Sequence, residues 1–163
     1  MDHLWTPWRK AYLRGETAPR TGCLFCSVLK EDDDELNLVV HRGARVFAML
    51  NRYPYSNGHL LLIPNEHVSS LEEASLDSLT ELMALSQATL RALREAYGPE
   101  GFNMGVNIGA AAGAGIPDHV HAHILPRWVG DTNFMTTVAQ TRIIPEDLIV
   151  TYARMKDLLA EFI

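Results

Sequence analysis

The segment His119-Val-His-Ala-His-Ile-Leu125 is the stretch of the chain that says most about its fold. In an extended strand, residues two apart point to the same side, so the three imidazoles line one face while the apolar residues between them point to the core. A row of titratable rings is costly to bury without partners, so packing alone gives no reason for it. The segment therefore predicts a strand with a functional site on one face.

Two kinds of chemistry use such a row of histidines. Imidazoles on one face can converge on zinc, or one neutral imidazole can act as a nucleophile while its neighbours orient it and handle protons. The small residues of segment 109–115 precede the row, and they let backbone N–H groups approach an anion closely. This combination favours phosphate chemistry. A histidine-ligated zinc metallohydrolase stays as an alternative, although it needs carboxylate ligands and Asp118 is the only adjacent acid.

The rest of the chain alternates predicted strands with two predicted helices. Apolar runs bounded by turn residues predict further strands, at 37–41, 45–50, 59–63 and 102–108. Apolar residues at three- and four-residue steps predict a long helix over about 70–97 and a C-terminal helix over 145–163. Two helices are too few for βαβ crossovers, so we expect an α+β fold in which an antiparallel sheet of about five strands has its helices on one face. The acidic run Glu31–Glu35 is expected to be a solvated turn.

Composition excludes several classes of protein. A chain of 163 residues with 47% hydrophobic and 21% charged residues is typical of one globular domain. The net charge of −6 argues against a partner that is a nucleic acid polymer. No apolar run approaches the ~18 residues of a membrane span, and the polar start is not a signal peptide. Cys23 and Cys26 cannot make a disulfide scaffold, and their spacing indicates metal or redox chemistry in a reducing compartment, so we expect a cytoplasmic protein.

The histidine segment matches the His-φ-His-φ-His-φ-φ signature (φ, apolar) of the histidine triad (HIT) family of nucleotide hydrolases and transferases. Two other segments, NRYPYSNGHLLLIP at 51–64 and FNMGVN at 102–107, resemble the family's loop-strand segment and its Asn-bearing strand. The resemblance implies a HIT-like fold. Segments 5–9 and 126–134 are most similar to the branch of bacterial diadenosine tetraphosphate phosphorylases and hydrolases.

The resemblance covers roughly residues 22–128 and divides the chain into three parts. Residues 1–21 are an N-terminal arm, 22–128 are the family core, and 129–163 are a C-terminal extension with its helix. Members of this family are usually dimers, so the resemblance also implies a homodimer.

The resemblance implies that the triad histidines His119, His121 and His123 are the catalytic group. His121 would attack the α-phosphorus of a dinucleoside polyphosphate or related nucleotide and form a covalent nucleotidyl-histidine, which water or inorganic phosphate would release. His123 and His59 would bind phosphate oxygens or assist the leaving group. A histidine suits this role because its ordinary pKa leaves the ring largely neutral at cellular pH.

The resemblance also assigns nucleotide contacts. Asn51 matches the position that holds the ribose hydroxyls, Asn107 matches one beside the phosphates, and Trp128 fits a wall of the nucleotide site or a subunit contact. The family often has a polar residue, commonly Gln, where this chain has Gly115. Backbone N–H groups or water would have to replace that donor. This departure keeps a nucleotide-binding protein with little turnover as an alternative.

The cysteine pair supplies half of a tetrahedral zinc site. In some triad proteins, the other two ligands come from the histidine of a Pro-x-x-His segment and from the first triad histidine. Here those residues are His67 and His119, which with Cys23 and Cys26 make a complete ligand set. We expect a structural zinc that ties the N-terminal segment to the histidine strand without being the catalyst, and no organic cofactor.

Overall fold

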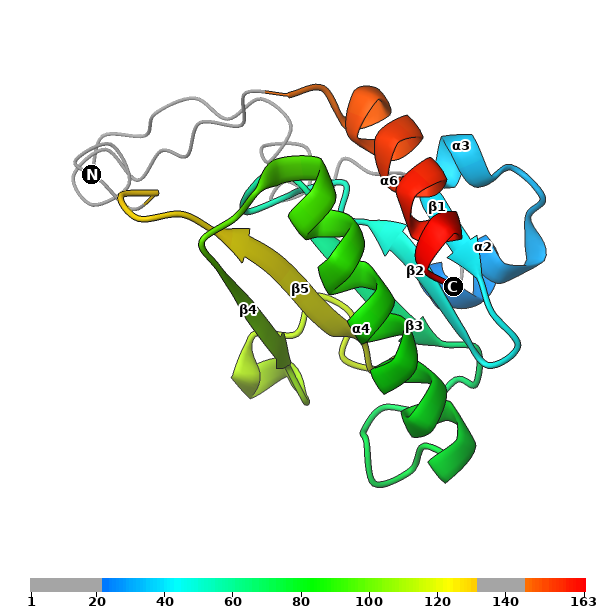
Figure 1. Cartoon of the computed structure of the whole chain (residues 1–163). Helices are drawn as coiled ribbons and strands as arrows, with labels where there is room; N and C mark the ends of the chain where they lie inside the picture. Colours follow the sequence, from blue (N-terminus) through cyan, green and yellow to red (C-terminus); the bar gives the residue numbers. More distant parts are fainter. Residues whose placement is uncertain (1–21, 132–145) are drawn as a thin grey trace, which may run out of the picture.

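The computed structural model describes residues 22–131 and 146–163, and in this part of the chain five strands form one antiparallel sheet (Figure 1). The order of the strands across the sheet is β1-β2-β3-β5-β4. Their bounds are Val39–Arg42 for β1, Val46–Leu50 for β2, Leu60–Pro64 for β3, Gly101–Val106 for β4 and Ala122–Arg127 for β5. The predicted α+β architecture with a five-stranded antiparallel sheet is confirmed.

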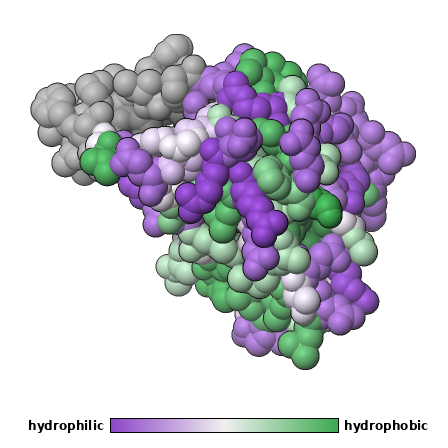
Figure 2. Space-filling view, viewed as in Figure 1, coloured by the Kyte–Doolittle hydropathy of each residue, from purple (hydrophilic) through white to green (hydrophobic). Residues whose placement is uncertain are grey.

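Two long helices cover one face of this sheet. Helix α4 (Leu76–Tyr97) crosses the sheet and packs beside α6 (Leu148–Phe162), as Figure 1 shows. Both helices are amphipathic, and Figure 2 shows hydrophilic residues spread among hydrophobic ones over the outer surface of this layer. No helix in the described ranges is long and apolar enough to cross a membrane.

A short helix covers the opposite face, where the sequence predicts none. Strand β2 shows the two sides clearly, because alternate residues of a strand point to opposite faces. Ala48 and Leu50 pack in the core under α4 and α6, whereas Phe47 and Met49 pack against Phe25 of helix α2 (Leu24–Lys30). The two predicted helices lie on one face as expected, and α2 is an additional helix on the other face that the sequence did not predict.

The histidines lie on the α2 side of the sheet. Ala122 and Ile124 of β5 belong to the core under α4, so His123 between them points to the other face. The predicted strand from His119 begins too early: β5 begins at Ala122, so His119 and His121 lie in the extended segment just before it. Their side chains nevertheless keep the alternation that an extended chain imposes.

Two further boundaries differ from the sequence prediction. Helix α4 begins at Leu76 and not near residue 70, because Ser75 caps it by accepting a hydrogen bond from the N–H of Ser78. The acidic run 31–35 is not only a solvated turn. It leads into the short helix α3 (Asp34–Asn37), which Asp33 caps by accepting from the N–H of Leu36.

Candidate active site

The α2 side of the sheet is hollowed into a cleft of about 1520 Å³. One wall is α2, a second is the end of β2 with the loop that follows it, and a third is the loop 113–118. His121 and His123 both line this cleft. The predicted row of imidazoles therefore faces an open space and not the packed interior.

His121 is held in one protonation state by its surroundings. Its Nδ1–H donates to the carbonyl oxygen of His119 over 2.9 Å, so in the neutral ring the lone pair is on Nε2. The ring of Phe25 packs edge-on against it at 5.0 Å between centroids. Burial lowers the pKa of His121, and the bond to the carbonyl opposes this only in part. The ring is therefore neutral at neutral pH, which is the nucleophilic form.

A chain of hydrogen bonds fixes the proton on His123. The N–H of Tyr55 can only donate, so Nδ1 of His59, 3.2 Å away, must accept and the proton of His59 must be on Nε2. That Nε2–H then donates to Nδ1 of His123 over 3.0 Å, which leaves the proton of His123 on its own Nε2. Burial, with His121 nearby, lowers the pKa of His123 to about 4.

Nε2 of His123 is enclosed and has no hydrogen-bond partner within the described residues. Leaving a buried N–H unpaired costs roughly 1–3 kcal/mol, so such a group in a cleft is a donor positioned for a ligand. The site thus combines a lone pair on His121 with an N–H donor on His123, with 4.9 Å between the centroids of the two rings.

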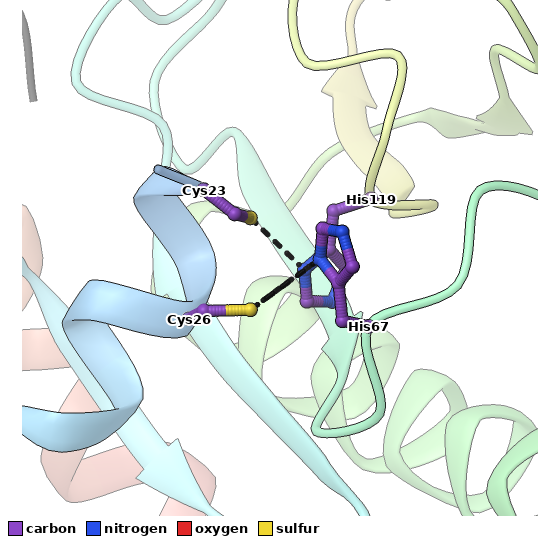
Figure 3. Close-up of side chains that lie close together, drawn as sticks. All are labelled: Cys23, Cys26, His67 and His119. Carbon is purple, nitrogen blue, oxygen red and sulfur yellow. Dashed lines mark hydrogen bonds between the residues drawn. The ribbon is translucent and has the colours of Figure 1, made fainter. Parts of the chain in front are cut away.

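Beside this pair, four side chains form a cluster that can hold a metal ion (Figure 3). The ligand atoms of Cys23, Cys26, His67 and His119 all lie within 4.8 Å of one another. Nδ1 of His119 is 3.2 Å from Sγ of Cys23, 3.7 Å from Sγ of Cys26 and 3.3 Å from Nδ1 of His67. Tetrahedral zinc with ordinary bond lengths separates its ligand atoms by about 3.3–3.8 Å, which fits these distances.

The surroundings of the cluster also fit a metal site. Nε2–H of His119 donates to the carbonyl oxygen of Pro64 over 2.9 Å, and this bond leaves the lone pair of Nδ1 directed at the two sulfur atoms. Burial raises the pKa of the Cys26 thiol, so a cation is needed to make it a thiolate at neutral pH. Within the described residues this is the only cluster of three or more such ligands, and it excludes His121 and His123, which disfavours the metallohydrolase alternative.

The remaining predicted site residues divide into two groups. Asn51, Asn107 and Gly115 line the cleft, and His59 lies behind His123 as its hydrogen-bond donor. Trp128 follows β5 and is not among the residues that line the described cleft, so its contact with a nucleotide stays a prediction. The tryptophans at 5 and 8 lie outside the described residues.

Sequence reasoning missed two residues of the cleft. Phe25 lies between the two cysteines and packs against both His119 and His121, at 5.3 Å and 5.0 Å between ring centroids. An apolar residue on the first turn of a metal-binding helix is a signal that could have placed it. The backbone N–H of Tyr55, which sets the proton on His59, carries no signal in the sequence because it depends on the path of the loop.

The sequence of this chain is similar to those of known proteins. The family model of the HIT domain matches residues 34–129. A protein named AP-4-A phosphorylase from Mycobacterium tuberculosis is 38% identical over 152 residues, which cover 90% of this chain and 78% of that protein. An adenosine 5'-monophosphoramidase of Schizosaccharomyces pombe is 35% identical over 105 residues, covering 64% of this chain and 74% of that protein.

Solved structures show the same fold. The crystal structure of a Zn-bound histidine triad family protein from Mycobacterium smegmatis has a TM-score of 0.70 at 26% identity, and the match covers 86% of this chain and 94% of that one. A hypothetical histidine triad nucleotide-binding protein from Sulfolobus tokodaii has a TM-score of 0.69 at 30% identity, covering 85% of this chain and 93% of that one.

Proposed function

The chain belongs to the histidine triad family of nucleotide hydrolases and transferases, and from that premise we propose that it cleaves dinucleoside polyphosphates at the α-phosphate through a covalent nucleotidyl-histidine. The similarity to a protein named AP-4-A phosphorylase supports this substrate class. The observation that carries the proposal is the protonation state of His121: a neutral ring, locked at Nδ1, with its Nε2 lone pair in a cleft.

In the first step, the Nε2 lone pair of His121 attacks the α-phosphorus. The bond from phosphorus to the bridging oxygen breaks, and the nucleotidyl group remains on Nε2. The ring gains positive character, which the Nδ1–H bond to the carbonyl of His119 stabilises. No base has to remove a proton from this nucleophile, because the neutral imidazole already offers a lone pair.

The leaving polyphosphate departs as an anion that His123 stabilises. Nε2–H of His123 is a donor with no partner among the described residues, and Nε2–H of His59 donates to Nδ1 of His123 and holds that ring in place. Because both rings are neutral, the pair supplies a hydrogen bond to the departing oxygen and keeps its own protons. Asn51 is proposed to hold the ribose, and Asn107 to contact the phosphates, as the family resemblance implies; both line the cleft.

In the second step, water or inorganic phosphate attacks the nucleotidyl-histidine and restores the free Nε2. Water gives a nucleoside monophosphate, and phosphate gives a nucleoside diphosphate. We propose that phosphate is accepted, because the loop at 113–116 offers donors to an anion. No hydrogen bond in the described part of the chain uses the backbone N–H of Gly115 or Ile116 as its donor. Both residues line the cleft, so these N–H groups can take the place of the missing polar side chain.

Zinc is proposed for the cluster of Cys23, Cys26, His67 and His119, on the strength of its donor set and distances. When bound, zinc would supply structural cross-linking and no chemistry on the substrate, because none of the four ligands is the nucleophile or the hydrogen-bond donor to the leaving group. The chain's own residues do the rest: His119, fixed at both ring nitrogens, presents the carbonyl that orients His121.

One observation favours a second candidate, a nucleotide-binding protein with little turnover. The side chain that the family often places at position 115 is absent, and Gly115 offers only its backbone N–H to the α-phosphate. Backbone donors to a developing charge are worth as much as side-chain donors only when they are aimed at it. In that case the cleft would bind the nucleotide and release it unchanged.

The test is product analysis with diadenosine tetraphosphate in isotopically labelled inorganic phosphate. We expect ADP that carries the label, and a protein adduct one adenylyl group heavier when the reaction is quenched early. His121→Ala should lose both product and adduct. His41→Gln, a histidine on β1 that does not line the cleft, is the matched control and should keep both. Products without an adduct on His121 would overturn the proposal, and binding without products would favour the second candidate.

A further inference from the structure

Asn37 is a buried polar residue of the cleft that the proposed chemistry does not use. It is the last residue of α3, only 3% of the residue is exposed, and it lines the cleft. A buried amide with several donors and acceptors must satisfy most of them, so each of its atoms can be followed to a partner.

Glu31 fixes the orientation of the Asn37 amide. The distance between Nδ2 of Asn37 and Oε2 of Glu31 is 2.8 Å, and a carboxylate oxygen accepts, so the amide nitrogen must face it. Glu31 is held in turn at its own backbone, where its carbonyl accepts from the guanidinium of Arg42 over 2.8 Å. Oδ1 of Asn37 therefore points away from Glu31.

Oδ1 of Asn37 is not sealed inside the protein. In the described part of the chain no hydrogen bond reaches this oxygen. It is also not among the enclosed atoms that lack a partner, which are Asn57 Oδ1, Asn65 Oδ1, Thr89 Oγ1 and His123 Nε2. An unbonded oxygen that is not enclosed, on a residue that lines the cleft, has its acceptor sites available to a ligand.

The surroundings of Asn37 suit a nucleobase. Apolar side chains of one buried cluster, Phe25, Val28 and Met49, line this cleft, and Phe25 also touches the ring of His121. The N–H of Leu50 donates to the carbonyl of Leu38 over 2.9 Å, which brings Asn37 beside Asn51, the proposed ribose contact. A nucleotide whose α-phosphate is at His121 and whose ribose is at Asn51 therefore has its base in the apolar part of the cleft that Asn37 borders.

We propose that Asn37 selects the base, and that it prefers adenine to a 6-oxopurine. This inference rests on the proposed function, because it needs a nucleotide bound with its α-phosphate at His121. The 6-amino group of adenine donates to Oδ1, and the amide N–H not used by Glu31 is available to a neighbouring ring nitrogen. A 6-oxopurine instead brings a carbonyl oxygen against Oδ1, which leaves two acceptors facing each other.

The expected selectivity follows from that mismatch. A single well-placed amide contact to a base discriminates by about 10- to 100-fold. We therefore expect kcat/KM for diadenosine tetraphosphate to exceed that for diinosine tetraphosphate by at least about 10-fold, and AMP to bind more tightly than IMP in calorimetry by a similar factor. Inosine differs from adenosine only in the group at position 6 and in the proton on the adjacent ring nitrogen N1, so the ratio isolates this edge of the base.

Variants at two positions test the assignment. Asn37→Ala should lower kcat/KM for the adenine substrate and leave the inosine substrate nearly unchanged, so that the ratio falls to about 1. Glu31 is a positioning residue: Glu31→Ala frees the amide to rotate and should reduce the ratio, whereas Glu31→Gln keeps an acceptor for Nδ2 and should preserve much of it. A substitution that only destabilises the protein would lower kcat/KM for both substrates by the same factor and leave their ratio unchanged.

The outcomes separate this inference from the function on which it rests. If the unmodified protein cleaves both substrates and binds AMP and IMP equally, the role of Asn37 is wrong and the proposed function stands. If the ratio is unchanged in Asn37→Ala, the role of Asn37 is likewise wrong and the proposed function stands. If neither nucleotide is bound or cleaved, both the proposed function and this inference fail. If Asn37→Ala does not fold, the two variants at Glu31 decide the matter: the ratio should fall in Glu31→Ala and largely survive in Glu31→Gln, and equal ratios in the two would contradict the assignment.

Discussion

Each imidazole of the cleft has one neighbour that decides which of its nitrogens carries the proton. For His119 and His121 that neighbour is a backbone carbonyl, which can only accept. For His59 it is the N–H of Tyr55, which can only donate, and the consequence passes on to His123. The three triad rings are chemically identical, yet among the described residues one can ligate a metal, one has an unshared lone pair and one has an N–H without a partner.

The depressed pKa of His123 predicts how stability depends on pH. Its pKa is about 4 in the folded protein, against about 6.5 in an unfolded chain, so between these values only the unfolded state binds the proton. The stabilising contribution of this histidine is therefore complete above pH of about 6.5 and is lost as the pH falls toward 4, at a slope approaching about 1.4 kcal/mol per pH unit.

Urea unfolding at a series of pH values measures this slope. His123→Asn removes the titrating group, so the free energy of unfolding should fall less steeply between pH 6.5 and 4.5 than in the unmodified protein. Above pH 7 the two profiles should run parallel, which is the internal control. Equal slopes in the acid range would show that His123 is protonated in the folded protein and contradict the pKa assignment.

Helix α2 joins the metal cluster to the cleft. The cysteines at its N-terminal end belong to the cluster, Phe25 packs on His121, and Arg42 holds its C-terminal end by donating to the carbonyls of Val28 and Leu29. A helix of seven residues is too short to be stable alone, so its position depends on these attachments. Its N-terminal attachment is the one that a bound metal would provide.

Removing the metal should therefore release this end of α2. We expect about one zinc per chain in the purified protein, and loss of both cysteine ligands in Cys23→Ser with Cys26→Ser should remove it and lower the Tm by about 5–10 °C. Elemental analysis and thermal unfolding with and without a chelator are the measurements. His41→Gln should keep its metal and its response to the chelator. A protein purified without metal, or one whose Tm is the same with and without the chelator, would contradict the assignment of a zinc site.

Short elements were the ones that the sequence could not predict. Periodicity identifies a helix as long as α4, but α3 has only four residues and shows no period. Leu38, the residue after α3, adopts a left-handed conformation with φ of 60°, which a sequence does not signal for leucine. Asn37 owes its place in the cleft to this turn, so sequence reasoning had no means of finding it.

At the scale of the whole molecule, the pairing of β3 with β5 assembles both sites. The strands are antiparallel, so the end of β3, which leads to His67, meets the start of β5, which His119 precedes. Residue types and local spacing identified the triad and the cysteine pair. That Cys23 lies close to His67 and His119 could be predicted only from the family resemblance or read from the folded sheet, because such long-range contacts depend on strand order.

The edge of the sheet that no other described strand covers predicts a second copy of the chain. Strand β4 pairs with β5 on one side and is the last strand of the described sheet on the other, and Asn103, Met104 and Gly105 are exposed. An open edge with an exposed methionine is a template for pairing with another chain. We therefore expect a homodimer with twice the 18.2 kDa of the chain in sedimentation or light scattering.

Two methionine variants test this interface. Met104→Lys should shift the dimer to monomer, because a charge on the edge opposes pairing. Met83→Lys on α4, equally apolar and similarly exposed at 55% against 42%, should remain a dimer. A monomeric unmodified protein, or a dimer that only the substitution at Met83 disrupts, would place no interface at β4.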